Sequence, residues 1–516
     1  MSTTTLLYII ILLIPVIIVV QFVLMIVILK RLNKIEKKLY KKLLTRTNVA
    51  ASTPNSTKSG REDTTTPIPQ EPIDKLPAPI APTPQKPIPS TPTPTPTLQI
   101  PAARRSILGT SKFRLPGTRT NREKVIQAIR KIKEVEEKDI PSVMNELNSY
   151  FSKHQNSDYS HDIKSKDYYR FIDLRSQPDK RIVVIGDIHS DFHSLSALLL
   201  KLSVSEYDYY EKGMFVFLGD YLDRGTCLFE PLLLLKELSE ILGERLIILK
   251  GNHETIKYDN NTNEIQTRVT PNQSTQCLNL YCNKNKGFLK NFADFYSSLP
   301  IYVYVKTRER NILLTHAAIP RDIWMDSFRF DEKNGAIVLI GSAMNPLETR
   351  NGILKDMIWG DPKDCEEKIQ SGGRFEFGRK QYNRFKSKNN IGILIRSHEE
   401  ASNGYRSFYN DSLFTVFSTG GKENAQTDYH AVEPAFSVIQ QNGQLFFENS
   451  YLYKVQNNGT YTFINPFSGK TYSEEQVTAF HFENEFVCDT ELKEELTIFF
   501  LKEKEVFPSD TATADN

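Results

Sequence analysis

Short apolar runs recur through the middle of the chain, and each one stops at a group of polar residues. The runs are RIVVIGDIHSD (181–191), MFVFLGDYLDRG (214–225), RLIILKGNHE (245–254), NILLTHAAIP (311–320) and IGILIRSHEE (391–400). Their length and their content of β-branched residues predict buried strands. Because ligands gather where the strands of α/β sheets end, we expect these distant polar residues to meet in one cleft.

Helical periodicity appears on both sides of this region. Apolar residues recur at helical spacing in 121–151, where Pro141 is expected to separate two short helices. We therefore place a main domain over 107–455. After it, a strand-like TYTFI and later helical spacing predict a small mixed appendage over 456–503, followed by a disordered tail over 504–516.

The N-terminus carries an apolar run from Leu6 to Leu29 that contains no charged residue. About 20 apolar residues suffice to cross a bilayer as a helix, so 6–29 is predicted to span and 1–5 to be a short extracytosolic tail. A cleaved signal peptide is disfavoured, because the apolar stretch is too long and no basic residue precedes it. The basic segment 30–46 follows, so the positive-inside rule places the rest of a single-pass membrane protein in the cytosol.

Residues 47–106 are rich in threonine, serine and proline. Such a stretch cannot build a core, and it predicts a disordered tether between the membrane and the main domain. Its PxxP spacings also fit SH3-type or WW-type partner domains. Since PxxP arises by chance in any proline-rich run, a spacer is the simpler interpretation.

Composition narrows the setting. A chain of 516 residues with 39% hydrophobic residues can bury a large core, and a net charge of +3 gives no reason to expect a nucleic-acid partner. Five scattered cysteines favour reduced thiols in the cytosol over a disulfide framework. Cys277 and Cys282 resemble half of a zinc site, but no matching ligand pair follows them.

The residues at the strand ends suit two divalent cations acting on a phosphate ester. Two such cations clamp the attacking and leaving oxygens and make a bound water nucleophilic. Asp220 is the natural carboxylate bridge between them, while neutral histidine and asparagine ligands keep the net positive charge that attracts phosphate. Arg224 adds a two-pronged phosphate donor. His253, held as an imidazolium by Asp223, is the candidate acid for the leaving alkoxide.

The combination of these residues is more informative than any one of them. A lone histidine or a Gly-Asp turn more often has a structural role, but four of the nine histidines stand at these strand ends. The others are expected to be structural or solvated, namely His154, His161, His193, His430 and His481.

The series GDIH, GDYLDRG, GNHE, a strand-end His316 and RSHE resembles the PPP family of serine/threonine protein phosphatases, within the calcineurin-like metallophosphoesterases. The resemblance covers roughly 120–455 and includes MIWGDP (357–362) and FEFG (375–378). It implies an α/β fold, a β-sandwich flanked by helices with a two-metal site at the strand ends. It also implies hydrolysis of phosphoserine and phosphothreonine in phosphoproteins by direct attack of a metal-bound water.

The resemblance assigns individual roles. The implied ligands of one metal are Asp187, His189 and Asp220, and those of the other are Asp220, Asn252, His316 and His398. Asp223 and His253 match the acid pair, and Arg224 matches a phosphate-binding arginine. Two divalent ions are implied, with Mn²⁺ as the first expectation and iron or zinc as alternatives.

Four features of the sequence depart from the family pattern. Ser190 stands where a glycine is usual, and Ala317 and Ala318 replace a pair of glycines. The second phosphate arginine aligns with Ser371, whereas the arginine of this chain, Arg374, lies three residues later. The loop that brings a tyrosine near the site in the family is STGGKEN (418–424) here. These changes bear on substrate binding and inhibitor sensitivity, and Arg374 is the candidate second phosphate ligand.

Two alternatives accompany the protein phosphatase interpretation. A dinucleoside-polyphosphate hydrolase or another calcineurin-like phosphoesterase is disfavoured, because such enzymes often end their site with a G-H-x-H pair and this chain has only RSHE. A membrane-tethered pseudophosphatase that binds phosphoproteins is disfavoured because no metal ligand is missing.

Overall fold

The computed structural model describes residues 120–154, 169–177, 179–282, 285–331, 336–339, 352–368, 374–457, 460–466, 468–473, 487–488 and 490–501. All of them belong to the unit Ile100–Asn516. The predicted membrane span 6–29, the basic segment 30–46, the linker 47–106 and Ser371 lie outside the described residues and stay sequence predictions. Within the ranges described, no helix combines the length and apolar character needed to cross a membrane.

Two β-sheets form the centre of this unit. The five-stranded sheet has the order β17 (Leu445–Asn449), β16 (Ala435–Ile439), β2 (Ile182–Ile185), β3 (Met214–Phe217) and β4 (Leu246–Ile248). The six-stranded sheet has the order β1 (Tyr169–Asp173), β7 (Tyr302–Lys306), β8 (Asn311–Thr315), β13 (Ile393–Arg396), β15 (Leu413–Val416) and β14 (Tyr405–Phe408). Strands β2, β3 and β4 are parallel, as are β8, β13 and β15. The five predicted strands are therefore confirmed.

Alternation along each strand makes these sheets the middle layers of a sandwich. In β2, Val183 and Ile185 pack with the helices, whereas Val184 packs in the cluster between the two sheets. In β8, Leu313 faces the helical side and Leu314 faces the opposite sheet. Strands that are buried on both faces must be apolar throughout, which explains the uninterrupted runs in the sequence.

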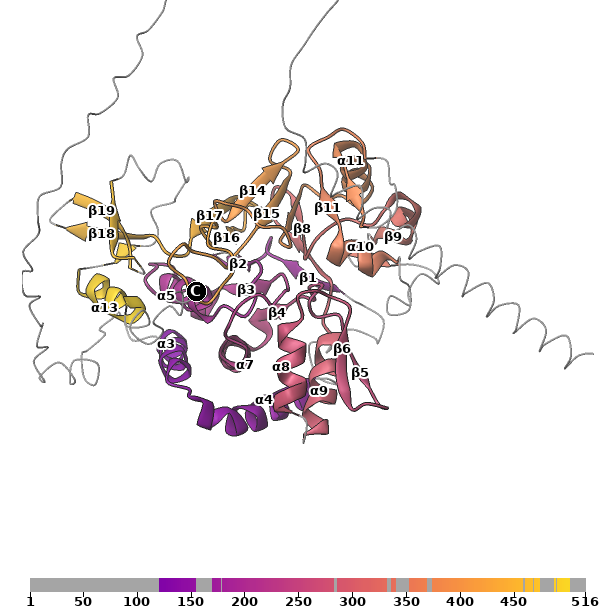
Figure 1. Ribbon diagram of the computed structural model, residues 1–516. Helices are drawn as coiled ribbons and strands as arrows, with labels where there is room; N and C mark the ends of the chain where they lie inside the picture. The colour runs from indigo at the N-terminus through magenta and orange to yellow at the C-terminus, as the bar shows by residue number, and fades with distance from the viewer. Residues whose placement is uncertain are drawn as a thin grey trace, which may run out of the picture. The chain divides into compact units, whose positions relative to one another are not determined.

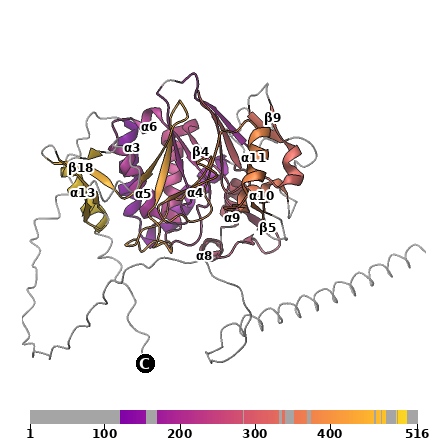
Figure 2. The ribbon, with the colours of Figure 1, turned by 90° about the horizontal axis from the view of Figure 1, so that it is seen from above.

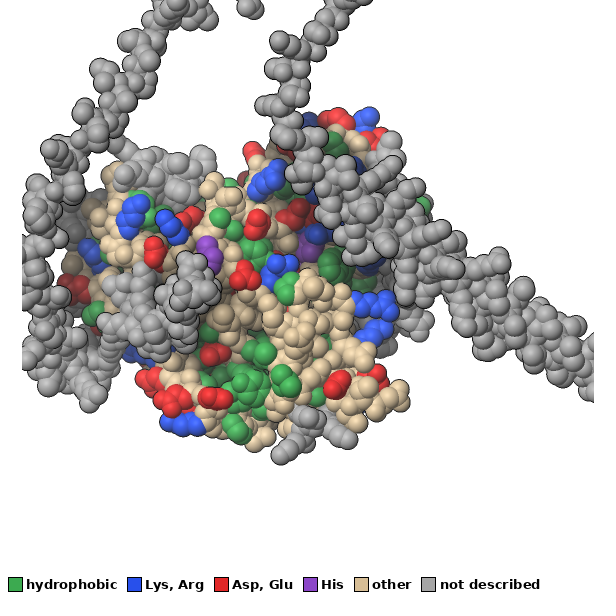
Figure 3. Space-filling view, in the orientation of Figure 1, with side chains coloured by type: hydrophobic (Ala, Val, Ile, Leu, Met, Phe, Trp, Pro, Cys, Tyr) green, Lys and Arg blue, Asp and Glu red, His purple; other side chains and the backbone are tan. Residues whose placement is uncertain are grey.

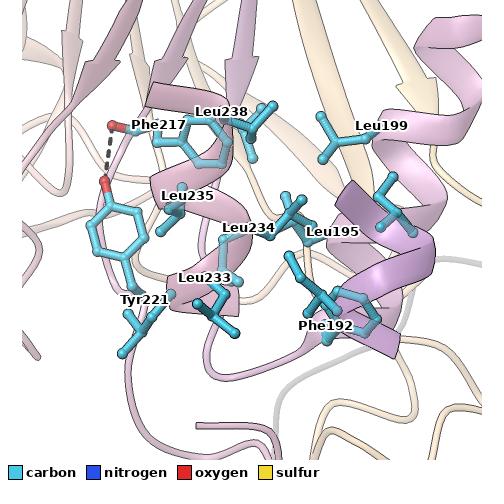
Figure 4. Close-up of a cluster of buried hydrophobic side chains, with 14 of the residues drawn as sticks. Phe192, Leu195, Leu199, Phe217, Tyr221, Leu233, Leu234, Leu235 and Leu238 are labelled. Atoms are coloured by element: carbon cyan, nitrogen blue, oxygen red, sulfur yellow. Dashed lines mark hydrogen bonds between the residues drawn. The ribbon is translucent and has the colours of Figure 1, made fainter. Parts of the chain in front are cut away.

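Helices cover both outer faces of the sandwich (Figure 1). Helices α5 (Phe192–Ser203) and α7 (Phe229–Leu242) lie on the five-stranded sheet, and α10 (Ile353–Trp359) and α11 (Arg379–Lys388) lie on the other. Figure 2 shows the strands between these two helical groups. Leucines of α5 and α7 face one another next to Phe217 of β3 (Figure 4).

Smaller elements complete the unit. The further helices are α3 (Thr120–Lys133), α4 (Ile140–His154), α6 (Tyr209–Lys212), α8 (Gln273–Tyr281), α9 (Lys286–Ser297) and α13 (Thr490–Leu501). The further strands are β5 (Ile256–Asp259), β6 (Glu264–Thr267), β9 (Phe328–Asp331), β10 (Ala336–Leu339), β11 (Asp361–Pro362), β12 (Glu376–Phe377), β18 (Tyr453–Asn457), β19 (Thr460–Asn465), β20 (Lys470–Tyr472) and β21 (Val487–Cys488). Three 3₁₀ turns span Glu137–Asp139, Gly243–Arg245 and Asp322–Ser327.

The two helices predicted over 121–151 are confirmed, but the position of the break is different. The chain leaves α3 at Lys133 and passes through the turn Glu137–Asp139, and Pro141 is the second residue of α4. Proline fits the first turn of a helix, because the N–H that it lacks would have no partner there. Pro141 therefore helps to start α4 rather than to separate the helices.

The C-terminal elements pack directly on the main core. Tyr453 and Phe500 belong to the same hydrophobic cluster as α5, and the Phe500 ring stacks on His193 with centroids 5.2 Å apart. Lys201 of α5 is fully buried, and its ammonium donates to Glu448 Oε2 at 3.0 Å and to the carbonyl oxygen of Leu452 at 2.7 Å. These contacts hold the segment after β17 against the helical layer.

Gly186 lies where the two sheets approach most closely. A Cβ atom at this position would sit 2.2 Å from the carbonyl oxygen of Val416 in the facing sheet. The carbonyl oxygen of Val416 is a backbone atom and cannot move aside as a flexible side chain could. We therefore expect Gly186→Ala to lower the free energy of unfolding by about 3 kcal/mol. The measurement is the midpoint of chemical denaturation. Gly287→Ala, at an open helical position, is the control and should not lower it.

Candidate active site

Five strand ends bring the predicted site residues together. Asp187 and His189 follow β2, Asp220 and the pair Asp223 and Arg224 follow β3, and Asn252 and His253 follow β4. From the other sheet, His316 follows β8 and His398 follows β13. A β-bridge between Asp187 and Phe417 joins the two sheets at this point. The structure thus brings these side chains together at one edge of the sandwich.

The turns that carry these residues have an unusual backbone conformation. Positive φ angles occur at His189 (46°), Asp220 (54°), Asp223 (66°), Arg224 (67°) and His398 (75°). Residues with a side chain seldom adopt this conformation, and such strain persists only where surrounding contacts enforce it. It is typical of sites at which the direction of a side chain matters more than local stability.

Glu254 supplies much of that enforcement. Its carboxylate is fully buried and accepts hydrogen bonds from the backbone N–H groups of Asp220 (2.8 Å), Tyr221 (2.9 Å) and Gly251 (2.9 Å). Gly251 has no room for a side chain, because a Cβ atom would lie 2.1 Å from Asp220 Oδ1. Glu254, the last residue of the GNHE motif, thus holds the turn after β3 that carries Asp220.

The first group of ligand atoms surrounds His189. Its Nδ1 donates to the carbonyl oxygen of Leu222 at 2.9 Å, so Nε2 carries a lone pair whenever the ring is neutral. Nε2 lies 3.5 Å from Asp187 Oδ2 and 3.7 Å from Asp220 Oδ2. A ring nitrogen of His253 also lies within 4.8 Å of the His189 and Asp220 ligand atoms.

The second group surrounds His316. Its Nδ1 donates to the carbonyl oxygen of Leu218 at 3.1 Å, so Nε2 points toward the other ligands. Nε2 lies 3.0 Å from Asn252 Oδ1, 3.1 Å from His398 Nδ1 and 3.4 Å from Asp220 Oδ1. Asp220 therefore contributes one carboxylate oxygen to each group, as expected of a bridging ligand.

The residues of both groups fit divalent cations. Asp187 Oδ2 is buried and has no hydrogen-bond partner among the described residues, although a buried carboxylate oxygen normally has one. Around His316, an amide oxygen, a carboxylate oxygen and two imidazole nitrogens converge, and lone pairs at this spacing repel unless a cation or a proton lies between them. Carboxylate, imidazole and amide donors together suit manganese, iron or zinc.

The carboxylates and imidazoles of the site shift one another's pKa values. Burial acts to lower the pKa of His189, but the nearby carboxylates of Asp187 and Asp220 raise it to about 9. Burial acts in the same direction on His316, whose pKa is raised by Asp220. The neighbouring imidazoles overcome burial at Asp220 and hold the pKa of that carboxyl well below its usual range. The carboxylates of Asp187 and Asp220 thus stabilise positive charge, a proton or a cation, at the ring nitrogens.

Asp223 and His253 form a separate buried pair next to these groups. His253 Nδ1 lies 2.7 Å from Asp223 Oδ2, and Asp223 Oδ1 accepts from the backbone N–H of Ser274 at 2.8 Å. The backbone N–H of His253 donates to Asp220 Oδ1 at 3.0 Å. A carboxylate on one ring nitrogen orients the imidazole and stabilises its protonated form, as an acid catalyst requires.

The two predicted phosphate-binding arginines lie on different sides of the site. The Arg224 guanidinium is half-buried, 5.8 Å from the centroid of the Tyr429 ring. Arg374 donates to His398 Nε2 and is fixed by Asp361, with its Nη2 2.8 Å from Asp361 Oδ1. Arg374 is thus adjacent to the second ligand group, although the family pattern places an arginine at another position.

Tyr429 is a site residue that the sequence did not indicate. Its ring stacks on His189 with centroids 5.5 Å apart and meets Phe417 edge-on at 4.8 Å. Tyr429 follows the STGGKEN loop by five residues, and no spacing rule pointed to it. Figure 3 shows histidine, acidic and basic side chains exposed close together in the middle of this face.

A buried polar network holds the STGGKEN loop in place. Asp191 accepts from the Ser194 N–H (3.0 Å), Thr419 Oγ1 (2.7 Å) and Asn424 Nδ2 (2.8 Å). The loop is therefore held by hydrogen bonds to Asp191, which is also the N-cap residue of α5. This arrangement fixes the chain immediately before Tyr429.

Ser190, Ala317 and Ala318 have local effects only. Ser190 is buried in the turn after His189, at a positive φ of 52°. The backbone N–H groups of Ala317 and Ala318 both donate to the carbonyl oxygen of Met357, at 2.8 and 3.1 Å. Ala317 and Ala318 are buried and hydrogen-bonded through their backbone, whereas the buried hydroxyl of Ser190 has no hydrogen-bond partner among the described residues.

Comparison with known proteins agrees with this geometry. Residues 180–400 match the family described as calcineurin-like phosphoesterase. We call this matching segment the phosphoesterase domain. It contains all the predicted metal ligands, from Asp187 to His398.

Individual relatives of the phosphoesterase domain are catalytic subunits. The chain is 25% identical to serine/threonine-protein phosphatase 4 catalytic subunit of Saccharomyces cerevisiae over 250 residues, 47% of this chain and 70% of the relative. It is 29% identical to serine/threonine-protein phosphatase 6 catalytic subunit of Caenorhabditis elegans, over 46% of this chain and 64% of the relative. A solved serine/threonine phosphatase from Saccharomyces cerevisiae with similarity to human phosphatase PP5 superposes with a TM-score of 0.42 at 20% identity, over 61% of this chain and 89% of that one.

Substitution of Tyr429 tests its role in the phosphoesterase domain. Tyr429→Leu removes the ring that packs on His189 and faces Arg224, so kcat/KM for an aryl phosphate should fall about tenfold. Tyr429→Phe keeps the ring and should stay within about twofold of the unchanged protein. Equal losses in the two variants would show that the hydroxyl, not the ring, matters.

Metal binding to the phosphoesterase domain should depend on pH. Because the pKa of His189 is raised to about 9, its ring is largely protonated at pH 7, and a cation must displace that proton. The affinity for Mn²⁺ should therefore rise from pH 7 to pH 9, by about tenfold per pH unit for each proton displaced. Calorimetric titration in buffers of different ionisation enthalpy measures both quantities. A flat affinity without proton release would contradict this prediction.

Proposed function

We propose that this chain is a serine/threonine protein phosphatase that hydrolyses phosphoserine and phosphothreonine in protein substrates. The observation that carries the proposal is the buried Asp223–His253 pair beside two ligand groups that share Asp220. Relatives named as serine/threonine-protein phosphatase catalytic subunits support this substrate class.

Each group has a definite task in this reaction. Two divalent cations, with Mn²⁺ as the first choice, would be held by Asp187, His189, Asp220, Asn252, His316 and His398. When bound, such ions supply a Lewis acid and a water that is nucleophilic at neutral pH. Arg224 and Arg374 bind the phosphate oxygens from opposite sides through charge-assisted hydrogen bonds.

His253 acts on the leaving group. A serine or threonine alkoxide is very basic, so its departure requires a proton at the moment the phosphorus–oxygen bond breaks. The ring nitrogen of His253 that does not contact Asp223 can donate that proton. Asp223 stabilises the protonated ring beforehand and is itself fixed by Ser274.

The proposed location comes from the sequence. The apolar run 6–29 and the basic segment 30–46 support a single-pass membrane protein whose phosphoesterase domain lies in the cytosol. Its substrates would then be phosphoproteins at or near the membrane surface.

One assay separates the proposed activity from its alternatives. The full-length chain with Mn²⁺ is offered a phosphothreonine peptide and a dinucleoside tetraphosphate in parallel, and phosphate release is measured. We expect turnover of the peptide, and a loss of several orders of magnitude in Asp220→Asn, because that carboxylate belongs to both ligand groups. Asp411→Asn makes the same chemical change in an exposed turn and should retain full activity.

Other outcomes of this assay point elsewhere. Cleavage of the nucleotide alone would identify a dinucleoside-polyphosphate hydrolase. Binding of the phosphopeptide without turnover of either substrate would identify a pseudophosphatase.

A further inference from the structure

A second polar surface lies at the end of the β-sandwich away from the ligand groups. We call it the basic basin, and its polar lining includes Arg175, Lys306, Arg308, Arg310, Asn311 and Asn390. It has a cavity volume of about 650 Å³, which is room for several side chains of a bound segment. The proposed catalytic chemistry uses none of these residues.

Two strands connect the basic basin with the active site. Asn311 begins β8, and His316 follows the end of that strand. Gly392 lines the basin just before β13, whose far end leads to His398. At about 3.3 Å per residue, the two sites are separated by roughly 17 Å along β8 and roughly 20 Å along β13.

The frame of the basic basin is rigid. The backbone N–H of Arg308 donates to the carbonyl oxygen of Gln441 at 3.0 Å, which ties the turn after β7 to the turn after β16. Thr307 Oγ1 donates to the carbonyl oxygen of Arg310 at 2.6 Å, and Asn311 Nδ2 donates to that of Asn390 at 2.8 Å. The basin therefore presents its cations from a fixed backbone, and a ligand would not have to order a loop.

Positive charge is in excess here. The ten lining residues include four cationic side chains and one carboxylate, which gives a net charge of +3. Arg175 pairs with Asp173 at 2.6 Å, and Arg310 lies 3.6 Å from Glu309. Within the described part of the chain, no carboxylate lies within 4.0 Å of the Arg308 guanidinium.

A neighbouring lysine adds to this excess. Burial and the positive charge of Arg310 together lower the pKa of Lys386. The cations of this region thus repel one another, and an anionic partner would relieve that repulsion. Guanidinium groups bind carboxylates and phosphates through paired hydrogen bonds, and a concave surface suits a chain segment better than a flat bilayer.

We propose that the basic basin is a docking site for an acidic polypeptide segment, rich in aspartate, glutamate or phosphoserine. In a protein substrate, such a segment would raise the effective concentration of a distant phosphorylated residue at the active site. This deepens the proposed function by naming a class of substrate, and that part of the inference rests on the proposed function. The docking itself does not depend on catalysis.

Binding is tested first, without any phosphate in the ligand. A fluorescent peptide rich in aspartate and glutamate is titrated with the full-length chain at low salt, and its anisotropy is measured. Arg308→Glu combined with Arg310→Glu should weaken binding about tenfold or more. Lys131→Glu combined with Lys290→Glu makes the same change in net charge at exposed positions on α3 and α9, and should leave binding unchanged.

Kinetics then test the link to the active site. Two phosphothreonine peptides carry either an acidic or a neutral cluster at the end of a 16-residue glycine–serine linker, whose mean span is about 20–24 Å. The acidic peptide should have a KM about tenfold lower at equal kcat. The Arg308→Glu/Arg310→Glu variant should lose this difference and still hydrolyse p-nitrophenyl phosphate at the unchanged rate.

Three results would overturn the proposal. Absence of peptide binding to the unchanged protein would mean that the basin is only a solvated surface. Equal weakening in both double variants would mean that net charge alone attracts the peptide. Binding of a short-chain anionic phospholipid but not of the peptide would assign this face to a membrane. A protein without phosphatase activity that still binds the acidic peptide through Arg308 and Arg310 would refute the proposed function alone.

Discussion

Two buried carboxylates, Asp187 and Asp220, approach the same ring nitrogen of His189, and the structure around them is arranged to tolerate that negative charge. Among the described residues, no lysine or arginine forms an ion pair with either carboxylate. Their partners are imidazoles, backbone N–H groups and the hydroxyl of Ser397, which donates to Asp187 Oδ1. Burying unbalanced charge is costly, so this arrangement favours the binding of external cations. Arg224 and Arg374 lie farther from the two carboxylates, beside Tyr429 and His398, where they can bind a phosphate.

The β-sandwich makes this concentration of charge possible. Side chains of both sheets form the apolar cluster between them, and the polar turns begin only where the strands end. Glu254 and the tight contacts at Gly186 and Gly251 then fix the turns at short range. The ligands thus depend on backbone positions that the core has already determined, and several φ angles remain unfavourable at little risk to the fold.

The sequence was most informative where chemistry and local structure coincide. A strand followed by Gly-Asp or Gly-Asn and histidine carries its ligand within a few residues of the strand end, so the ligands could be predicted from residue type and spacing. Tyr429 could not, because it reaches His189 through a loop whose course is set by Asp191, more than 200 residues earlier. The role of Asp361 could not be predicted either, because it depends on contacts with Arg374 and the buried Arg396 that only the fold brings about. Pro141 shows the opposite difficulty, since a proline can either end a helix or begin one.

The order of strands in the five-stranded sheet also bears on how this protein is made. Strand β2, which carries Asp187 and His189, lies between β3 and β16, and β16 spans Ala435–Ile439. A ribosome synthesises the chain from the N-terminus, so β2 waits for about 250 further residues before its second neighbour exists. Lys201 waits about as long for Glu448 and the carbonyl group of Leu452. Nascent chains interrupted just before Ala435 therefore carry all the proposed ligand residues, while β2 still lacks the neighbour that closes its other side in the five-stranded sheet.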